Sequence, residues 1–529
     1  MELPVVRRSL RLRRPQSKRP RTSSVVEPVS PRRSDEATSD SDFAPSSPGS
    51  SLAGDEEDEL FSLQHERKRP VRIRKAIDPV SSHSAPTPRS PGRCSLAPPE
   101  VLTLRTALLD WYADHFRTLP WRSSPIYQKG GLLPLTHSVP HSPSSPGAPY
   151  AVWVSEVMSQ QTRLSVVEGY FTRWMAAFPD IQALADAPRE KVNQLWAGLG
   201  YYRRARFLHE GAAQILSEYN GRLPEDVPTL LKIKGIGRYT AGAISSIAFG
   251  KNVPLVDGNV ERVLARLCPG LTSPREDGEQ RPPLPAAYWD LAEILVRDVQ
   301  CPGDFNQALM EFGATLCKPK AVLCEACPVQ DMCGAYQEAV ELGVENPAEY
   351  VTKYPIKDPK KATKVRNETV FVLVACVRTT SGYKYLVLQR PGDGLLAGLW
   401  EAPNVVLQSK TEAGKAKTYK TLQSLLSETI GHADEARRET AYTKMGEILQ
   451  VDVGKVTHVF SHIRQTLNVR LTVLQHPDGD GTLKDGKTST GVPFRWISEE
   501  ELKTGAVPTQ MKKVFAAAEK KLPRAHKLR

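Results

Sequence analysis

Four cysteines within 17 residues are the strongest sign of chemistry in this sequence, and their spacing is Cys317-x6-Cys324-x2-Cys327-x5-Cys333. Four thiolates in one short segment are able to surround a single metal centre. Zinc sites made of four cysteines usually contain two close pairs, whereas only Cys324 and Cys327 are closely paired here. The residues alone leave zinc and an iron–sulfur cluster, which four thiolates also hold, as the two candidates. We expect Lys318 and Lys320, in the six-residue gap, to meet a phosphate, with ordinary solvated lysines as the alternative.

A second motif lies between Leu230 and Ala241, where Gly235 and Gly237 stand one residue apart between two short helical patterns. Glycine permits a tight turn and a close approach of the backbone. The helix that follows points its free N–H groups at a phosphate. Two glycines alone are a weak signal, but the apolar residues before them and the segment 239–244 after them make it specific. The motif predicts a helix-hairpin-helix, which grips the DNA backbone without reading its sequence.

Two carboxylates accompany these motifs. Asp257 follows the hairpin by some 20 residues, in Val256-Asp257-Gly258-Asn259. Such a segment in isolation is more often a turn or a helix cap. Glu156 lies in the helical pattern YAVWVSEVMSQQT among apolar neighbours, which predicts burial, with an exposed helical glutamate as the alternative.

Together these motifs resemble the endonuclease III superfamily of DNA glycosylases and, within it, the MutY-type adenine DNA glycosylases. The resemblance runs from residue 100 to about residue 515. It rests further on Leu119-Pro120-Trp121-Arg122, on Tyr201 in WAGLGYYRRAR, on GLLAGLWEAPNV at 394–405 and on His458-Val459-Phe460-Ser461-His462. It implies a [4Fe–4S] cluster on the four cysteines. It also implies a multidomain fold, in which an all-α helix-hairpin-helix glycosylase domain precedes an α+β Nudix-like domain.

The resemblance also implies roles for single residues. Glu156 would protonate N7 of a flipped-out adenine, from a site apolar enough to raise its pKa. Asp257 would stabilise the cationic sugar, and Tyr239 and Asn259 would position the reacting groups. DNA contacts are expected from Arg122, Gln160, Gln161, Tyr201, Gly235, Gly237, Lys318 and Lys320. Reading of the lesion is expected from His458, Phe460, Ser461 and His462.

The position of Tyr239 separates two branches of the superfamily. Bifunctional relatives carry a lysine there, which forms the Schiff base that drives strand cleavage. Tyrosine cannot do so, and the resemblance therefore implies a monofunctional enzyme. Ser159 replaces the leucine usual beside the two glutamines, and the loop at 123–149 is longer than in most relatives.

We therefore expect a monomeric adenine DNA glycosylase that acts on duplex DNA with adenine opposite 8-oxoguanine or guanine. An endonuclease III-like lyase for oxidised pyrimidines is the main alternative, and Tyr239 and the second domain oppose it. A catalytically inactive iron–sulfur DNA-binding module is opposed by Glu156 and Asp257. A Nudix hydrolase is opposed by residues 398–435, which lack the Arg-Glu-x-x-Glu-Glu arrangement of the Nudix box. The segment 508–517 has Lys513 where a sliding-clamp motif needs an aliphatic residue, so we expect no clamp site there.

Length and composition define the elements that must position these residues. A chain of 529 residues suggests about three domains, and its net charge of +12 favours a nucleic-acid partner. No apolar run is long enough to span a bilayer, and the first residues lack the apolar core of a signal peptide, so we expect neither a membrane protein nor a secreted one. We expect a disordered tail at 1–96, a helical catalytic domain at 97–335, a linker at 336–366 without a second metal site, a Nudix-like domain at 367–505 and a basic tail at 506–529. The first 21 residues carry eight lysines and arginines, which predicts nuclear import, with a mitochondrial presequence as the alternative.

Overall fold

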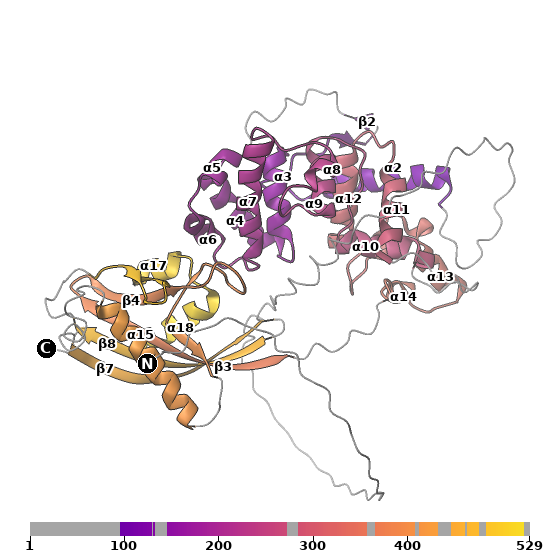
Figure 1. Cartoon of the computed structure of the whole chain (residues 1–529). Coiled ribbons are helices and arrows are strands. Elements are labelled where there is room, and N and C mark those ends of the chain that lie inside the picture. The colour runs from indigo at the N-terminus through magenta and orange to yellow at the C-terminus, as the bar shows by residue number, and fades with distance from the viewer. Residues whose placement is uncertain are drawn as a thin grey trace, which may run out of the picture. The chain divides into compact units, whose positions relative to one another are not determined.

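The computed structural model of the protein describes residues 96–129, 131–132, 145, 147–271, 284–356, 365–407, 412–431, 446–460, 463–475 and 483–522. These residues form a helical domain and a second domain built around a sheet (Figure 1). Residues 1–95, expected to be a disordered tail, and the residues Ser461 and His462 lie outside the described residues. Among the described helices, none combines the length and the apolar character that crossing a membrane requires.

The helical pattern at 97–335 predicts a helical domain, and the structure contains one. This domain has two adjoining cores. One core gathers large apolar side chains such as Trp153, Trp174 and Trp196, and the other gathers Leu264, Phe312 and their neighbours. The helices are α2 (Pro98–His115), α3 (Pro149–Ser159), α4 (Leu164–Ala177), α5 (Ile181–Ala185), α6 (Arg189–Trp196), α7 (Arg203–Glu218), α8 (Val227–Leu230), α9 (Arg238–Ala243), α10 (Gly258–Leu267), α11 (Leu284–Val296) and α12 (Pro302–Thr315). A short hairpin, β1 (Tyr127–Gln128) with β2 (Gly131–Leu132), lies in the long loop after α2.

The segment after the cysteines is folded further than the sequence suggests. Helices α13 (Gly334–Glu341) and α14 (Pro347–Val351) bury Ala335, Val351 and Tyr354 in a small cluster, against which Cys324 and Cys333 pack. The expected linker at 336–366 is therefore too long, because its first half belongs to the helical domain. Helices of one or two turns bury only two or three side chains, so their apolar periodicity is too weak to recognise in a sequence.

The second domain is a mixed sheet covered on both faces. Its strands are β3 (Arg366–Thr379), β4 (Gly382–Gln389), β5 (Trp400–Glu401), β6 (Asn404–Val406), β7 (Gly446–Val459), β8 (Ile463–Gln475), β9 (Gly486–Lys487) and β10 (Pro493–Ser498). They are ordered β7-β8-β3-β4-β10-β9, with β5 beside β4 and β6 beside β3. Strand β3 runs parallel to β8, and the remaining pairs in this sheet are antiparallel.

Successive residues of β3 supply two different cores, because side chains alternate across a strand. Val370, Val372 and Val374 face one core with α17 (Glu499–Thr504) and α18 (Thr509–Glu519). Phe371 and Leu373 face the other core with α15 (Glu412–Gly431) (Figure 1).

Helix α18 corrects the expected end of this domain. The sequence suggests a basic tail from residue 506, but Val507, Met511, Val514 and Phe515 are buried in the core. The ring of Phe515 packs against Tyr385 with 5.6 Å between ring centroids. The folded domain therefore extends to residue 522, and the segment compared above with a clamp motif is part of its core.

Candidate active site

Glu156 is a carboxylate placed on an otherwise apolar helix. Pro149 starts α3, and residues 150–155, 157 and 158 are buried around it. Glu156 itself is half-buried, and its Oε2 accepts a hydrogen bond of 2.5 Å from the hydroxyl of Tyr239. Burial raises the pKa of Glu156 to about 6, the charge of Asp257 adds to this, and the Tyr239 hydrogen bond and the charge of Arg122 oppose it. A carboxyl group with this pKa is suited to donate a proton near neutral pH.

Asp257 is both a helix cap and a neighbour of Glu156. As the N-cap of α10, its Oδ1 accepts hydrogen bonds from the backbone N–H groups of Asn259 (3.0 Å) and Val260 (2.8 Å). Its Oδ2 accepts one from Nδ2 of Asn259 at 2.8 Å. Burial raises the pKa of Asp257, and these hydrogen bonds act against that rise. Asp257 is therefore able to be a helix cap and an active-site carboxylate at once, because the hydrogen bonds of the cap hold the carboxylate in place.

Tyr239 lies in the first turn of α9, directly after the glycine pair. Besides Glu156, its hydroxyl contacts Sδ of Met310 at 3.2 Å. Burial raises the pKa of Tyr239 well above its ordinary value. The hydroxyl is therefore neutral and acts as a hydrogen-bond donor to Glu156.

The glycine pair forms the predicted helix-hairpin-helix turn between α8 and α9. Gly235 has φ of +84°, and a Cβ there would lie 2.6 Å from Cβ of Phe207. Both facts exclude a larger residue without a shift of the backbone. Gly237 is the N-cap of α9 with an ordinary φ of −93°. Of the two glycines, Gly235 is therefore the one that needs left-handed backbone.

Two of the expected DNA-contact residues have strained backbone. Gln161 has φ of +53° and Tyr201 has φ of +47°, which is uncommon outside glycine. The buried Arg204, which the sequence analysis missed, supports both turns. Its guanidinium donates to the carbonyls of Val157, Met158, Gln160, Leu199 and Gly200 and to Oγ1 of Thr162. Strain held by such a network is typical of functional sites.

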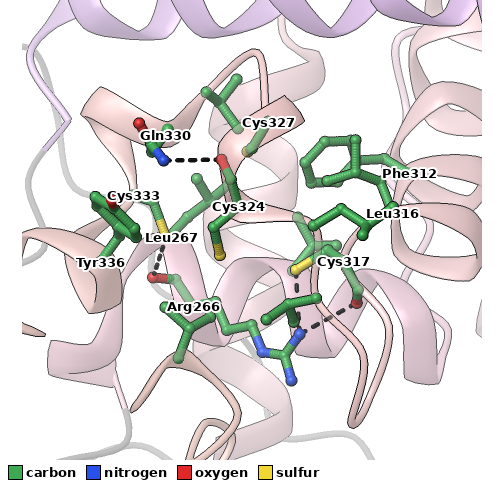
Figure 2. A pocket seen from close by; sticks show the side chains of 15 residues that line it. Arg266, Leu267, Phe312, Leu316, Cys317, Cys324, Cys327, Gln330, Cys333 and Tyr336 are labelled. Carbon is green, nitrogen blue, oxygen red and sulfur yellow. Dashed lines mark hydrogen bonds between the residues drawn. The ribbon is translucent and has the colours of Figure 1, made fainter. Parts of the chain in front are cut away.

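The four cysteines line one cavity (Figure 2). Phe312, Leu316 and Tyr336 supply apolar walls. Burial raises the pKa of Cys327 and of Cys333 to about 12, and the neighbouring cysteines add to the rise in both cases. Lys318 and Lys320 are exposed on the same loop. Within the described residues, no three His, Cys, Asp or Glu side chains converge as ligands of a single ion.

Two arginines of α10 connect the cysteine loop with Asp257, and the sequence analysis missed both. Arg266 is 1% exposed and donates to the carbonyls of Cys317, Lys318, Pro319 and Tyr354 and to Sγ of Cys317 (Figure 2). Arg262 donates to the carbonyls of Cys317 (2.9 Å) and Gly313 (2.6 Å) and to Oδ1 of Asn259 (2.9 Å). One helix therefore carries the carboxylate at its start and the anchors of the loop further along.

Two of the residues expected to contact DNA or read the lesion are buried in the structure. The side chain of Arg122 is 8% exposed and pairs with Glu311 at 2.8 Å, so it does not lie at the surface as a DNA contact would. Phe460 is also 8% exposed and meets the ring of His458 edge-on at 4.6 Å between ring centroids. Phe460 is therefore packed directly after the end of β7.

Comparison with known proteins identifies the two domains and the family of this chain. Residues 154–281 match the model of the HhH-GPD superfamily base excision DNA repair proteins, and residues 373–517 match that of the NUDIX domain. The chain is 37% identical to the adenine DNA glycosylase of Rattus norvegicus, over 82% of this chain and 81% of the relative. It is also 37% identical to the enzyme of Homo sapiens, over 79% and 74% respectively. The identity to the enzyme of Arabidopsis thaliana is again 37%, over 78% of this chain and 64% of the relative. With this identity over most of both chains, the protein belongs to the adenine DNA glycosylase family.

Proposed function

We propose that this protein removes adenine mispaired with 8-oxoguanine, and with guanine, from duplex DNA. The observation that carries the proposal is the pair of carboxylates, Glu156 and Asp257, next to a helix-hairpin-helix. A glycosidic bond to a purine breaks readily only when the base is protonated as it leaves. A half-buried carboxyl group with a raised pKa, beside a fixed second carboxylate, is an arrangement that supports this chemistry.

The proposed reaction assigns a separate task to each group. Glu156 donates its proton to N7 of an extrahelical adenine while the bond between C1′ and N9 breaks. The carboxylate of Asp257 stabilises the resulting sugar cation. Glu156 then accepts a proton from the water whose oxygen bonds to C1′, which restores the acid. Asn259 holds the carboxylate of Asp257 in place, and the hydroxyl of Tyr239 orients Glu156.

The same geometry supports a monofunctional enzyme. Tyr239 donates to Glu156 where a lyase of the superfamily would present a lysine amine, and a phenol forms no Schiff base. We expect the product strand to carry an intact abasic site that breaks only in alkali. Borohydride should trap no covalent complex with the wild type, but should trap one with Tyr239→Lys. Efficient trapping of the wild type would contradict the monofunctional assignment.

The cysteine cavity fits the proposed [4Fe–4S] cluster. Each of the four thiolates in such a cluster binds a different iron atom, so the sulfurs need not converge on one point, as ligands of zinc must. When bound, the cluster would cross-link the four thiolates of Cys317, Cys324, Cys327 and Cys333. Arg266 and Arg262 hold the loop from the other side, and Lys318 and Lys320 face solvent, where DNA phosphates would approach. Stoichiometric zinc without iron in the purified protein would refute this assignment.

Adenine is a normal base, so an enzyme that removes it must read the opposite strand. We propose that the second domain does this through residues 458–462, with Ser461 and His462 as hydrogen-bonding side chains and the packed residues His458 and Phe460 beside them. One such contact is worth about 1–3 kcal/mol of discrimination. The double variant Ser461→Ala/His462→Ala should therefore lose much of its preference for 8-oxoguanine·adenine over guanine·adenine. Equal losses on both substrates would mean that these residues only support the fold.

The decisive experiment uses the purified full-length protein and a duplex with one 8-oxoguanine·adenine pair. Strand breaks after hot alkali, and none before it, support the proposed activity. Release of oxidised pyrimidines with breaks before alkali would favour the endonuclease III-like alternative. Binding without release of any base would favour the inactive DNA-binding module.

We further propose that the protein acts in the nucleus, and the support for this is the basic run within the first 21 residues. A mitochondrial presequence is the alternative for the same run. A fluorescent fusion with residues 1–30 distinguishes the two, because only nuclear accumulation agrees with the proposal.

A further inference from the structure

Arg204, near the start of α7, is a buried cation whose contacts join two turns that lie far apart in the sequence. It is only 7% exposed. The first turn follows α3 and contains Gln161, and the second follows α6 and contains Tyr201. Burying a guanidinium is costly even when its hydrogen bonds are made, so stability alone is a weak reason for this arrangement.

Each turn is held at the peptide group that precedes its strained residue. Nη1 of Arg204 donates to the carbonyl of Gln160 at 2.6 Å, and Nη2 donates to the carbonyl of Gly200 at 3.2 Å. These carbonyls belong to the planar peptide groups that lead into Gln161 (φ +53°) and Tyr201 (φ +47°), so their orientation sets φ at both residues. One guanidinium therefore fixes the left-handed backbone of both turns.

Arg204 also fixes the ends of the two helices and the ring of Tyr201. Its guanidinium lies 5.2 Å from the ring centroid of Tyr201 and 5.3 Å from that of Trp196, which are distances of cation–π contacts. Its remaining hydrogen bonds go to the carbonyls of Val157 (2.9 Å), Met158 (3.0 Å) and Leu199 (3.4 Å) and to Oγ1 of Thr162 (3.3 Å). The cation thus also complements the negative C-terminal end of α3.

The two turns present side chains that suit DNA, close to the proposed acid. Glu156 lies within about one helical turn of the end of α3, so the Gln161 turn follows directly on the helix that carries it. The side chain of Gln161 is exposed and that of Tyr201 is half-buried. An extrahelical adenine leaves a gap among the stacked bases, where an aromatic ring stacks and an amide forms hydrogen bonds. Turns that are already fixed need less ordering when DNA binds.

We propose that Arg204 is a positioning residue for DNA recognition, which locks the Gln161 and Tyr201 turns together so that both side chains enter the duplex beside the extruded adenine. The proposal rests on the proposed function, because a gap has to be filled only when a base is extruded. Arg204 is too deeply buried to bind a phosphate itself and acts through the two turns.

The change Arg204→Lys tests this proposal, because it keeps the charge and removes the planar group that reaches both turns. Duplex binding is measured at fixed salt with Glu156→Gln present in every protein, so that adenine is not removed during the titration. Binding to 8-oxoguanine·adenine and to guanine·adenine duplexes should weaken equally, by about tenfold. Binding to undamaged duplex, which depends on phosphate contacts, should change by less than about twofold. A lysine that only destabilised the protein would weaken all three by the same factor.

A second background shows whether the effect passes through the two turns. In Gln161→Gly/Tyr201→Gly both side chains are absent, and glycine adopts left-handed backbone without strain. Adding Arg204→Lys there should not weaken binding to the mispaired duplexes any further. Arg105→Lys is a matched control, since Arg105 also donates to two backbone carbonyls, at 2.7 and 2.8 Å. It should leave all three affinities unchanged.

Two results would overturn the role of Arg204. One is an equal loss of binding to mispaired and undamaged duplexes, and the other is a loss on mispaired duplexes that persists in the glycine background. If Arg204→Lys does not fold, Thr162→Val serves instead, because it removes an acceptor of Arg204 and the hydrogen bond from Thr162 to the carbonyl of Gln160 at 3.2 Å. It should weaken binding to the mispaired duplexes alone, by about threefold, and unchanged binding would count against the proposal.

The parent protein separates a failure of this proposal from a failure of the proposed function. The protein that carries Glu156→Gln alone should prefer mispaired over undamaged duplex. If it shows no such preference, the proposed function is refuted, and the role of Arg204 with it. If the preference is present and Arg204→Lys leaves it intact, only the role of Arg204 is refuted.

Discussion

At the scale of single residues, activity and stability place opposite demands on Glu156. Its pKa of about 6 in the folded protein lies above its ordinary value of 4.5. A group whose pKa rises on folding stabilises the fold only while it is protonated, and that contribution is lost as pH rises from 4.5 through 6. The property that makes Glu156 an acid near neutral pH therefore destabilises the protein at that pH.

The change Glu156→Gln should remove both effects. Without the proton donor, single-turnover excision should fall at least about 10²–10⁴-fold, while binding to the mispair persists. Thermal unfolding at pH 7.5 should occur at a higher temperature than in the wild type, and the difference should vanish near pH 4, where both forms are neutral. Asn404→Asp serves as a control for the effect of a single exchange between an amide and a carboxyl group on unfolding, because Asn404 lies on β6 of the second domain. A near-wild-type rate in Glu156→Gln would remove this residue from the mechanism.

At the scale of elements, the hairpin depends on Gly235 for two separable reasons. Its φ of +84° disfavours any side chain, and a Cβ would also collide with Phe207. Gly250 offers a matched comparison, because its φ is +63° and no atom lies within 4 Å of the point that a Cβ would occupy. Left-handed backbone costs a residue with a side chain about 1–2 kcal/mol.

We therefore expect Gly250→Ala to lose only that amount of unfolding free energy and to bind undamaged duplex normally. Gly235→Ala should lose more and should bind duplex more weakly, because the turn must move to relieve the contact with Phe207. Denaturant unfolding and duplex titration at fixed salt measure the two quantities. Equal behaviour of the two variants would mean that close packing at the hairpin is unimportant.

Helix α10 is the second element on which the site depends. With one planar group Arg266 donates to four carbonyls, of which that of Tyr354 is buried, and to the sulfur of Cys317, which the single ammonium of a lysine cannot do. Each buried acceptor left without a partner costs about 1–3 kcal/mol. Arg266→Lys should therefore lower the melting temperature and the iron content of the purified protein.

A matched control is Arg105→Lys, because Arg105 also donates to backbone carbonyls, those of Ile294 and Leu295 at the end of α11. This variant should lose some stability and keep its iron. If both variants retain iron equally, Arg266 is not the anchor of the cysteine loop.

These elements also explain what a sequence can predict here. The hairpin and the cysteine loop are local motifs, so the residue types and their spacing within one short segment indicate them. The partners of Arg122 and Arg266 are set by tertiary packing, since Glu311 lies 189 residues from Arg122 along the chain. Nothing near an arginine in the sequence reveals whether it is buried, so the pairing of Arg122 with Glu311 could not be predicted.

At the scale of the whole molecule, domain boundaries were the weakest prediction for a related reason. Composition separates the two domains well, but it assigned the segment after residue 505 to a tail because lysines are frequent there. Helix α18 nevertheless places Met511 and Phe515 in the core of the second domain and leaves Lys513 exposed. Charge frequency says little about an amphipathic helix, in which a few apolar positions decide the packing.

Two truncations test whether α18 belongs to the domain that is proposed to read the lesion. Ending the chain after Gly505 removes Met511, Val514 and Phe515 from the core, and losing large core side chains costs about 2–5 kcal/mol each. The second domain should then unfold, and the preference for 8-oxoguanine·adenine over guanine·adenine should disappear while slow removal of adenine continues. Ending the chain after Leu522 keeps the whole helix, so both unfolding and preference should match the full-length protein. Should the shorter chain keep its preference, lesion reading would have to lie in the helical domain; should the longer one lose it, residues 523–529 would contribute directly.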